Sequence, residues 1–273
     1  MLLSFYPLID GDLNLDLSNP RLFATETIKL IKRAKAIVLP PYCTACQYWF
    51  CKGYAEVFPN FDTRFYFGGK FGHTFLFSLC EVPFPPTKLY TGIEDFKKRH
   101  LENNEPLFPY PIVIKWSKGG GGAFVYKVNT IKGLLGALET FKRYEHRGPT
   151  FIIQPYIEHG GRDLRVVVIG KSILTYWRIQ TNPKEFRSNV GRGARIEYGV
   201  APKLEKKAIE LTKKVCNLTG INLAAFDILF PEEDPRPLFL EINYRFGLKG
   251  IGGPSAFRKV IKREAKSWWE SIK

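Results

Sequence analysis

Two short apolar runs with polar residues at defined places give the clearest pattern in the chain. Leu223–Phe230 and Pro237–Ile242 have the length of buried strands, and the sequence PEEDPRP that joins them has the composition of a turn. The two runs therefore predict an antiparallel hairpin. If the hairpin is symmetrical about Asp234, Asp227 lies opposite Glu241 and both side chains face the same side of the sheet.

Two carboxylates that face one another inside a hairpin repel each other and are driven toward protonation unless a cation lies between them. Asn243 shares the face of Glu241, because strand side chains alternate with period two. Asp227, Glu241 and Asn243 supply the oxygen ligands that magnesium prefers, and magnesium is usually shared with the phosphates of a substrate. These residues therefore indicate a magnesium site. In the alternative interpretation, Asp227 caps a turn, and Glu241 and Asn243 end an edge strand in solvent.

A second hairpin is indicated where a lysine interrupts an apolar strand. Pro111–Trp116 is rich in β-branched residues apart from Lys115, and the strand pattern resumes at Ala123–Val128. Glycine frees backbone amides to approach a ligand closely, so the glycines of the connection predict a flexible lid over phosphate groups. A plain hairpin turn is the alternative. The connection contains Gly119, Gly120, Gly121 and Gly122.

Further candidate residues lie at helix starts, on strands and in a polar loop. Lys70 lies at a glycine-flanked helix start, where backbone amides point outward toward a phosphate; a surface lysine is the alternative. Asp163 and Arg165 share one face of a hairpin strand. Arg187 and Asn189 lie in a loop without periodicity, which is typical of functional loops but also of solvated basic loops. Other predicted elements are a strand at Thr150–Gln154 and helices at Ile131–Tyr144, Lys203–Thr219 and Ala256–Ile272.

The first sixty-odd residues have a less regular pattern. Asn19–Lys35 predicts a helix that begins near Ser18–Pro20, and Ala36–Pro40 predicts a buried strand. A unit this short cannot form a complete doubly wound nucleotide-binding fold. We therefore expect it to support the rest of the chain.

Composition and charge narrow the class of protein. A hydrophobic content of 45% excludes a disordered chain, and the formal net charge of +15 favours anionic partners such as nucleotides and acidic substrates. The charge is scattered without an aromatic-basic signature, so we expect no direct nucleic-acid role. No apolar run reaches the length of a membrane span, and the N-terminus lacks the features of a signal peptide. We therefore expect a cytoplasmic protein with no membrane partner.

Five cysteines are an odd number in a chain without an export signal, which predicts reduced thiols. The spacing Cys43-x2-Cys46-x4-Cys51 is alternatively a zinc or iron–sulfur site, but it has no obvious fourth ligand nearby. We expect neither a stoichiometric metal nor a disulfide at these three residues.

The order of these features resembles the ATP-grasp superfamily. Its parts are a helix-start lysine, a strand lysine before a glycine lid, the linker QPYI, the hairpin sequence DLR, the loop FRSNVGRGA and the sequence DILFPEEDPRPLFLEIN. Within the superfamily the chain looks most like the RimK-type carboxylate–amine ligases, which add glutamate or similar amino acids to a carboxylate. The resemblance extends from about Lys70 to the C-terminus, and the last two sequences are its most specific parts.

The fold implied by this resemblance is α+β, with two lobes that grip a nucleotide, preceded by a shortened N-terminal α/β unit. The implied division is 1–67 for the N-terminal unit, 68–153 for the small lobe with its lid, and 154–273 for the large lobe with the magnesium-binding hairpin.

The resemblance also implies roles for individual residues. Arg165, Arg187 and Asn189 would face the transferred phosphate and the acyl phosphate. Two magnesium ions, replaceable by manganese, would be held by Asp227, Glu241 and Asn243, with Glu241 bridging. The linker departs from the family at Pro155, where relatives often carry an acidic or basic residue; a backbone contact with adenine survives this change. ATP itself would be bound at its phosphates, adenine and ribose by Lys70, Lys115, Gly119, Gly120, Gly121, Gly122, Gln154, Tyr156, Ile157 and Asp163.

The implied activity is ATP-dependent formation of an amide bond between a carboxylate acceptor and an amine, through an acyl phosphate, with an amino acid added to an acidic acceptor. Such chemistry needs positioned charges rather than a protein nucleophile. An ATP-dependent kinase or phosphotransferase and a non-catalytic nucleotide-binding regulatory protein would use the same nucleotide residues, and both stay open as alternatives. A homo-oligomer is compatible with all three.

Overall fold

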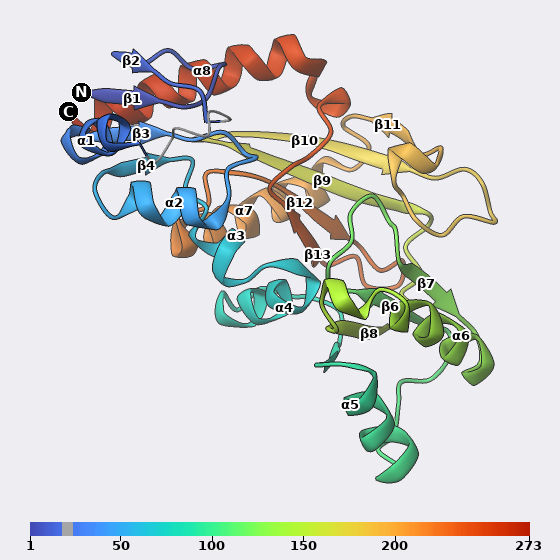
Figure 1. Cartoon of the computed structure of the whole chain (residues 1–273). Coiled ribbons are helices and arrows are strands. Elements are labelled where there is room, and N and C mark those ends of the chain that lie inside the picture. The colour runs from blue at the N-terminus through green and yellow to red at the C-terminus, as the bar shows by residue number, and fades with distance from the viewer. Residues whose placement is uncertain (18–23) are drawn as a thin grey trace.

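Three β-sheets organise the chain in the computed structural model, which describes residues 1–17 and 24–273 (Figure 1). The strand predicted at Ala36–Pro40 is confirmed, whereas the predicted start of the preceding helix lies outside the described residues. The first sheet is parallel and has the order β2–β1–β3–β4, with β1 (Leu2–Ser4), β2 (Leu13–Asn14), β3 (Ala36–Val38) and β4 (Glu56–Phe58). Its helices are α1 (Thr25–Arg33), α2 (Ala45–Lys52) and α3 (Asp62–Tyr66).

The second sheet is antiparallel and contains the lid hairpin. Pairing of Lys115 with Val125 confirms the predicted hairpin. The side-chain oxygen of Thr130 caps the helix that follows, by accepting from the amide of Gly133 at 3.2 Å. The strands, in the order β5–β8–β6–β7, are β5 (Lys88–Tyr90), β6 (Ile112–Trp116), β7 (Val125–Val128) and β8 (Phe151–Pro155). The helices are α5 (Ile93–Lys97), the π-helix Lys98–Glu102, α6 (Ile131–Lys142) and the 3-10 helix Glu145–Arg147.

The third sheet is antiparallel and includes the predicted Asp227 hairpin. Its interior strand β12 (Leu223–Leu229) is buried along its whole length, as the apolar run predicts. Gly220 ends the preceding helix in the left-handed conformation, at φ 71°. The other strands, in the order β11–β10–β9–β12–β13, are β9 (Arg162–Ile169), β10 (Ser172–Ile179), β11 (Arg195–Glu197) and β13 (Leu238–Asn243). The helices are α7 (Pro202–Thr219), α8 (Gly253–Ile272) and the 3-10 helices Val190–Arg192 and Lys249–Ile251.

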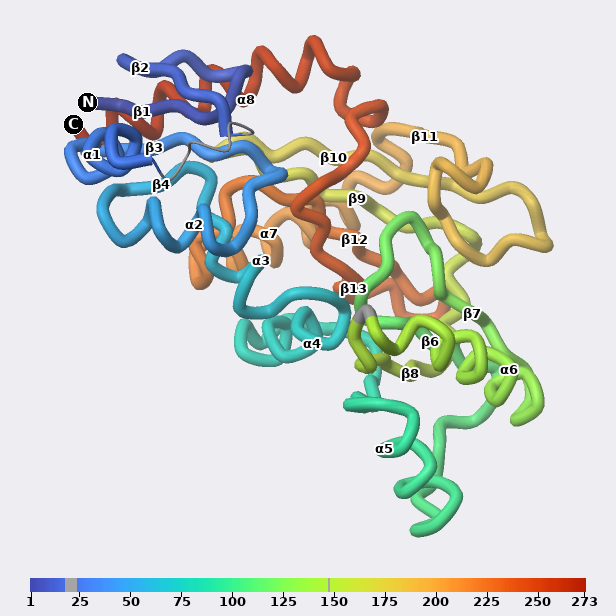
Figure 2. The backbone as a smooth tube through the Cα atoms, in the orientation of Figure 1, coloured from blue at the N-terminus to red at the C-terminus, as the bar shows by residue number. Residues whose placement is uncertain are grey.

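Two apolar cores stabilise these layers. The first and third sheets share one core, and the second sheet has its own, formed by residues between Tyr90 and Ile153. The chain ends lie side by side (Figure 2), and Lys35 Nζ donates to the carbonyl of Lys273 at 2.7 Å. None of the helices in the described ranges is long and apolar enough to cross a lipid bilayer. The shared core supports the expectation that the N-terminal unit stabilises the rest, while the unit boundaries stay a prediction.

Helix α4 (Gly69–Leu79) connects the lid hairpin to the first core. Its backbone amides at Lys70 and Phe71 donate to the carbonyl and hydroxyl oxygens of Ser117, at 3.2 and 3.1 Å. Gly69 has φ +76°, and a Cβ there would lie 2.6 Å from Ser117 Oγ, so only glycine allows this approach. The start of α4 is therefore held against the base of the lid, which positions Lys70.

Candidate functional site

A row of polar side chains crosses four strands of the third sheet. Strand pairing places Tyr176 opposite Arg165, Arg165 opposite Asp227, and Asp227 opposite Glu241. Residues paired in this way share one face of a sheet. The predicted pairing of Asp227 with Glu241 is confirmed, but the hairpin is not symmetrical, because the register shifts after Asp227 and Ile228 pairs with Phe239.

Two arginines neutralise the buried carboxylate of Asp227. Arg165 donates to its two oxygens at 2.7 and 2.8 Å, and Arg178 Nη2 lies 3.1 Å from its Oδ2. Arg178 also donates to the two oxygens of Asp163, at 2.7 and 2.6 Å. Burial by itself raises the pKa of Asp227, but the two guanidiniums hold that pKa at about 2. Burial raises the pKa of Asp163, although the charge of Arg178 opposes this shift. The four side chains therefore form a buried network of ion pairs in which Asp227 is ionised.

This network corrects one step of the sequence argument. A divalent cation is not required to offset the burial of Asp227, because arginines do so, and Lys70 Nζ lies 3.5 Å from Glu241 Oε1. The donor set still fits a hard divalent ion, since two carboxylates and the amide of Asn243 lie on paired strands; Asn243 Nδ2 is 3.2 Å from Asp227 Oδ2. Among the residues that the structure describes, no three His, Cys, Asp or Glu side chains are grouped to hold a metal. An ion bound here would therefore replace arginine and amide donors around Asp227.

The three N-terminal cysteines do not share one environment. Cys43 and Cys51 are buried, whereas Cys46 is exposed. Burial raises the pKa of Cys43 to about 11 and that of Cys51 to about 12, which favours thiols over metal-binding thiolates. The expectation that these cysteines hold no stoichiometric metal stays a prediction.

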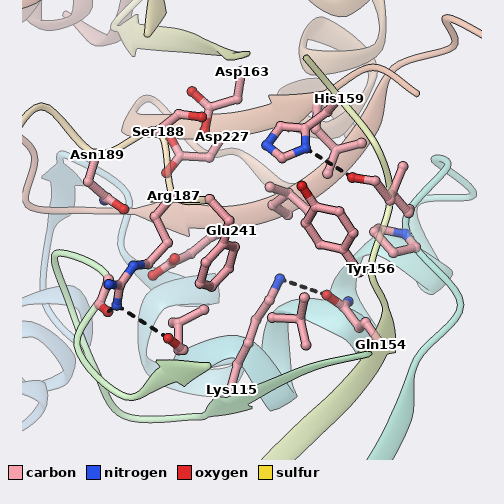
Figure 3. Close-up of a pocket in the computed structure, with 18 of the residues that line it drawn as sticks. Lys115, Gln154, Tyr156, His159, Asp163, Arg187, Ser188, Asn189, Asp227 and Glu241 are labelled. Atoms are coloured by element: carbon pink, nitrogen blue, oxygen red, sulfur yellow. Dashed lines mark hydrogen bonds between the residues drawn. The ribbon is translucent and has the colours of Figure 1, made fainter. Parts of the chain in front are cut away.

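A cavity, called the first cavity below, lies between the second and third sheets (Figure 3). Lys115 and Gln154 face it from the second sheet, while Asp163 and Asp227 face it from the third. A largely apolar cavity with a few convergent charged groups is typical of a small-molecule binding site. The apolar part of the lining includes Val113, Val125, Ile157, Leu229 and Leu240.

Two lysines reach this cavity from different elements. Lys115 of β6 donates to Gln154 Oε1 at 2.7 Å, and Lys70 of α4 donates to the carbonyl of Gly119 at 2.8 Å. Burial, followed by the charge of Lys70, lowers the pKa of Lys115 to about 8, although the two site carboxylates oppose this shift. Lys115 therefore titrates close to neutral pH.

The last glycine of the lid contacts the loop that carries Arg187 and Asn189. Arg187 Nη1 donates to the carbonyl of Gly122 at 2.9 Å, while its Nε and Nη2 donate to Glu185 at 2.7 and 2.8 Å. Gly122 has φ +74°, and a Cβ there would lie 2.8 Å from Asn189 Oδ1. The two preceding glycines have open space around them. The close approach of the lid to the loop of Asn189 therefore requires glycine at position 122. That the lid covers phosphates stays a prediction.

A second cavity meets the first at the polar row. Its own lining includes Arg165, Tyr176 and Asn243 from the third sheet, and Arg245 and Lys249 from the segment after β13. The contents of the two cavities would thus meet at the carboxylates of β12 and β13. The residues that line both cavities are Gly122, Arg178, Asn189, Asp227 and Glu241.

The structure brings most of the predicted site residues together. All except Gly119 and Gly120 line one or both cavities, and their ligand-binding roles stay predictions. The amide of Tyr156 donates to the carbonyl of Pro111 at 2.9 Å, and Lys127 Nζ lies 3.3 Å from the centre of the Tyr156 ring. The backbone amide of Tyr156 is therefore already bonded within the protein.

Arg178, which lies at the centre of the buried network, was not predicted from the sequence. Arg178 interrupts the apolar strand between Trp177 and Ile179 in the way that Lys115 interrupts β6. That interruption was the available signal. Arg245 and Lys249 were not predicted either, because they lie in a segment without a regular pattern.

Comparison with solved structures defines the class of fold. D-alanine–D-alanine ligase from Bacillus anthracis, complexed with ATP, aligns with a TM-score of 0.65 at 16% identity, over 96% of this chain and 90% of that chain. A RimK domain protein ATP-grasp from Sphaerobacter thermophilus aligns with a TM-score of 0.59 at 18% identity, over 84% of this chain and 81% of that one. The fold is therefore an ATP-grasp fold, as the resemblance implied.

The family model of the RimK-like ATP-grasp domain matches residues 70–259, and the chain belongs to this family. A relative from Pseudomonas aeruginosa named "Probable alpha-L-glutamate ligase" is 34% identical over 143 residues, which cover 52% of this chain and 44% of the relative. A relative of the same name from Aeromonas salmonicida is 31% identical over 157 residues, covering 56% of this chain and 50% of the relative. The match thus spans half or less of the length of these curated relatives.

Arg178→Met tests the buried network. We expect the free energy of unfolding to fall by about 3–5 kcal/mol, because removal of one partner leaves a buried carboxylate uncompensated. Urea unfolding followed by circular dichroism measures this change. The matched control is Arg236→Met, whose ion pair with Asp234 is 3.1 Å long with side chains 65% and 69% exposed. The control should lose less than about 1 kcal/mol, and equal losses in both variants would contradict the network's role.

Proposed function

We propose that the protein is an ATP-dependent carboxylate–amine ligase, which forms an amide bond between an acidic acceptor and an amino acid. The observation that carries this proposal is the meeting of two cavities at Asp227 and Glu241, with cationic side chains in the lining of both. A nucleotide in the first cavity and an acceptor carboxylate in the second would have their reacting groups at this junction. The family membership supports the same assignment.

In this proposal the first cavity takes ATP. Lys70 and Lys115 bind its phosphates, and the glycine lid covers them. The linker from Gln154 to Ile157 lies beside adenine, and Asp163 accepts hydrogen bonds from the ribose hydroxyls. Both Asp163 oxygens already accept from Arg178, but each carboxylate oxygen can accept a further donor.

The reaction then needs two substitutions. An oxygen of the acceptor carboxylate attacks the γ-phosphorus of ATP, which forms an acyl phosphate and releases ADP. The amine attacks the acyl carbon, loses a proton and expels inorganic phosphate. Arg165, Arg187 and Asn189 stabilise the negative charge that develops on the transferred phosphoryl group.

Catalysis without a protein nucleophile agrees with the polar groups of the first cavity. Ser188 and His159 both line it, but Ser188 Oγ donates to the carbonyl of Gly161 at 3.2 Å, and His159 Nδ1 lies 2.9 Å from the carbonyl oxygen of Ile157. Ser188 and His159 therefore do not form a pair of nucleophile and base.

Asp227, Glu241 and Asn243 would hold magnesium, as two ions, or manganese in its place. The ions would neutralise charge on the phosphates of ATP. Arg165 and Arg178 already form ion pairs with Asp227, so this carboxylate stays ionised. A magnesium ion that binds here would replace these arginines as the partner of Asp227. We also propose that the protein is located in the cytoplasm, where ATP is supplied. The proposed boundaries between its three units lie between residues 67 and 68 and between residues 153 and 154.

The proposed ligase should release ADP over many turnovers only when both a carboxylate and an amine are present, because without amine the reaction stops at the acyl phosphate. Turnover is measured with amino acids paired with candidate carboxylates. A phosphorylated product that accumulates over many turnovers without amine would identify a kinase, and nucleotide binding without any turnover would identify a regulatory protein.

Glu241→Gln should lower turnover about 100-fold or more, because the carboxylate that would hold magnesium beside the phosphates is lost. Glu233→Gln, in the exposed turn of the same hairpin, is the matched control and should leave turnover unchanged. Circular dichroism checks that both variants fold. Wild-type turnover in Glu241→Gln would remove the carboxylate from the mechanism.

Nucleotide affinity should fall as the pH rises through about 8, because only protonated Lys115 attracts phosphate and its pKa in the structure is about 8. Bound phosphates raise the pKa of Lys115, so the affinity should fall about tenfold per pH unit above the pKa of the free protein. Calorimetric titration with ADP and magnesium measures this slope. Lys115→Arg stays charged and should bind ADP without the slope. A slope that persists in this variant would assign the titration to another group.

A further inference from the structure

The outer wall of the second cavity carries two cations that the reaction as described does not use. Arg245 and Lys249 line this cavity, and both are exposed. Within residues 1–17 and 24–273, no carboxylate lies within ion-pairing distance of either side chain, unlike the other arginines of the cavity. Both cations are therefore available to an incoming anion.

A third cation, Arg64, is affected by the charge of Arg245. Arg64 of α3 donates from Nη1 to the carbonyl of Pro41 at 2.7 Å and lies over the ring of Phe61. Burial lowers the pKa of Arg64, and the charge of Arg245 lowers it further. Two guanidiniums close together repel one another, and an anion near them relieves that repulsion.

The charges inside the cavity do not supply this anion. Its lining contains four cations, Arg165, Arg178, Arg245 and Lys249, against two carboxylates, Asp227 and Glu241. Asp227 is held by Arg165 and Arg178, and Glu241 lies 3.5 Å from Lys70. The carboxylates are therefore occupied by cations deeper in the site, and the outer cations face a cavity with an excess of positive charge.

We propose that Arg245 and Lys249 are specificity-determining residues that bind a second carboxylate of the acceptor, while its first carboxylate lies at Asp227 and Glu241 and reacts. The substrate class is thus a di- or polycarboxylate, such as a peptide with an acidic C-terminal segment. This assignment rests on the proposed ligase function. Arginine and lysine on an accessible wall suit a carboxylate, because the arginine fork can bind both oxygens while the lysine adds a flexible point charge.

Two peptides that differ only in side-chain charge test this assignment. Tri-glutamine has one carboxylate, at its C-terminus. Tri-glutamate is a peptide of similar size that carries additional carboxylates on its side chains. Calorimetric titration in the presence of ADP and magnesium measures their affinities. Wild-type protein should bind tri-glutamate at least about tenfold more tightly, and the double variant Arg245→Gln/Lys249→Gln should reduce this ratio below about threefold.

The control double variant, Arg258→Gln/Lys259→Gln, removes the same charge from exposed positions of α8 outside both cavities. It should keep the wild-type preference, and all three proteins should bind ADP equally. The assignment is overturned if wild-type protein does not discriminate, if the double variant keeps the preference, or if the control loses it as well.

A parallel assay separates this assignment from the proposed function. ADP release with ATP and hydroxylamine, a general amine, reports acyl-phosphate formation on either peptide. If neither peptide supports release while tri-glutamate still binds through Arg245 and Lys249, the ligase function fails and the binding assignment stands. If both peptides react with equal kcat/KM, the ligase function stands and the specificity assignment fails.

Discussion

The ion pairs of Asp227 with Arg165 and Arg178 are the interaction on which the site depends. An ionised carboxylate inside a protein costs several kcal/mol unless its charge is compensated, and here two guanidiniums from neighbouring strands provide that compensation. Each contact requires one register between β9, β10 and β12, so the same contacts that keep Asp227 charged also align the strands. The site is thus rigid where charge must be placed accurately.

Two other parts of the molecule are fixed relative to this network. Lys70 connects it to the lid, since its ammonium lies 3.5 Å from Glu241 and donates to Gly119. Arg187 reaches the lid from the other side, through the carbonyl of Gly122. The lid hairpin therefore contacts both α4 and the loop after β10. This arrangement suits a reaction whose catalysis consists of positioning and charge neutralisation.

Local patterns predicted much of this fold because they depend on residues close in sequence. The pairing of Asp227 with Glu241 followed from a short hairpin, and the lid hairpin followed from Lys115 and the glycines. Arg178 was missed because its partners Asp163 and Asp227 are brought to it by pairing between distant strands, which no local pattern encodes. For the same reason Asp227 looked as if it needed a metal. The interruption of an apolar strand by a charge was visible at both Lys115 and Arg178, but the carboxylates that Arg178 contacts could not be read from the sequence.

The central claim is that the acceptor carboxylate is phosphorylated before the amine reacts, and an isotope transfer tests it most directly. An acceptor carboxylate labelled with oxygen-18 is incubated with ATP, magnesium and an amine, and the released phosphate is analysed by mass spectrometry. The account predicts that one labelled oxygen moves to inorganic phosphate for each amide formed, because the bond between the carbonyl carbon and that oxygen breaks when the amine attacks. Amide formation with unlabelled phosphate would contradict the account.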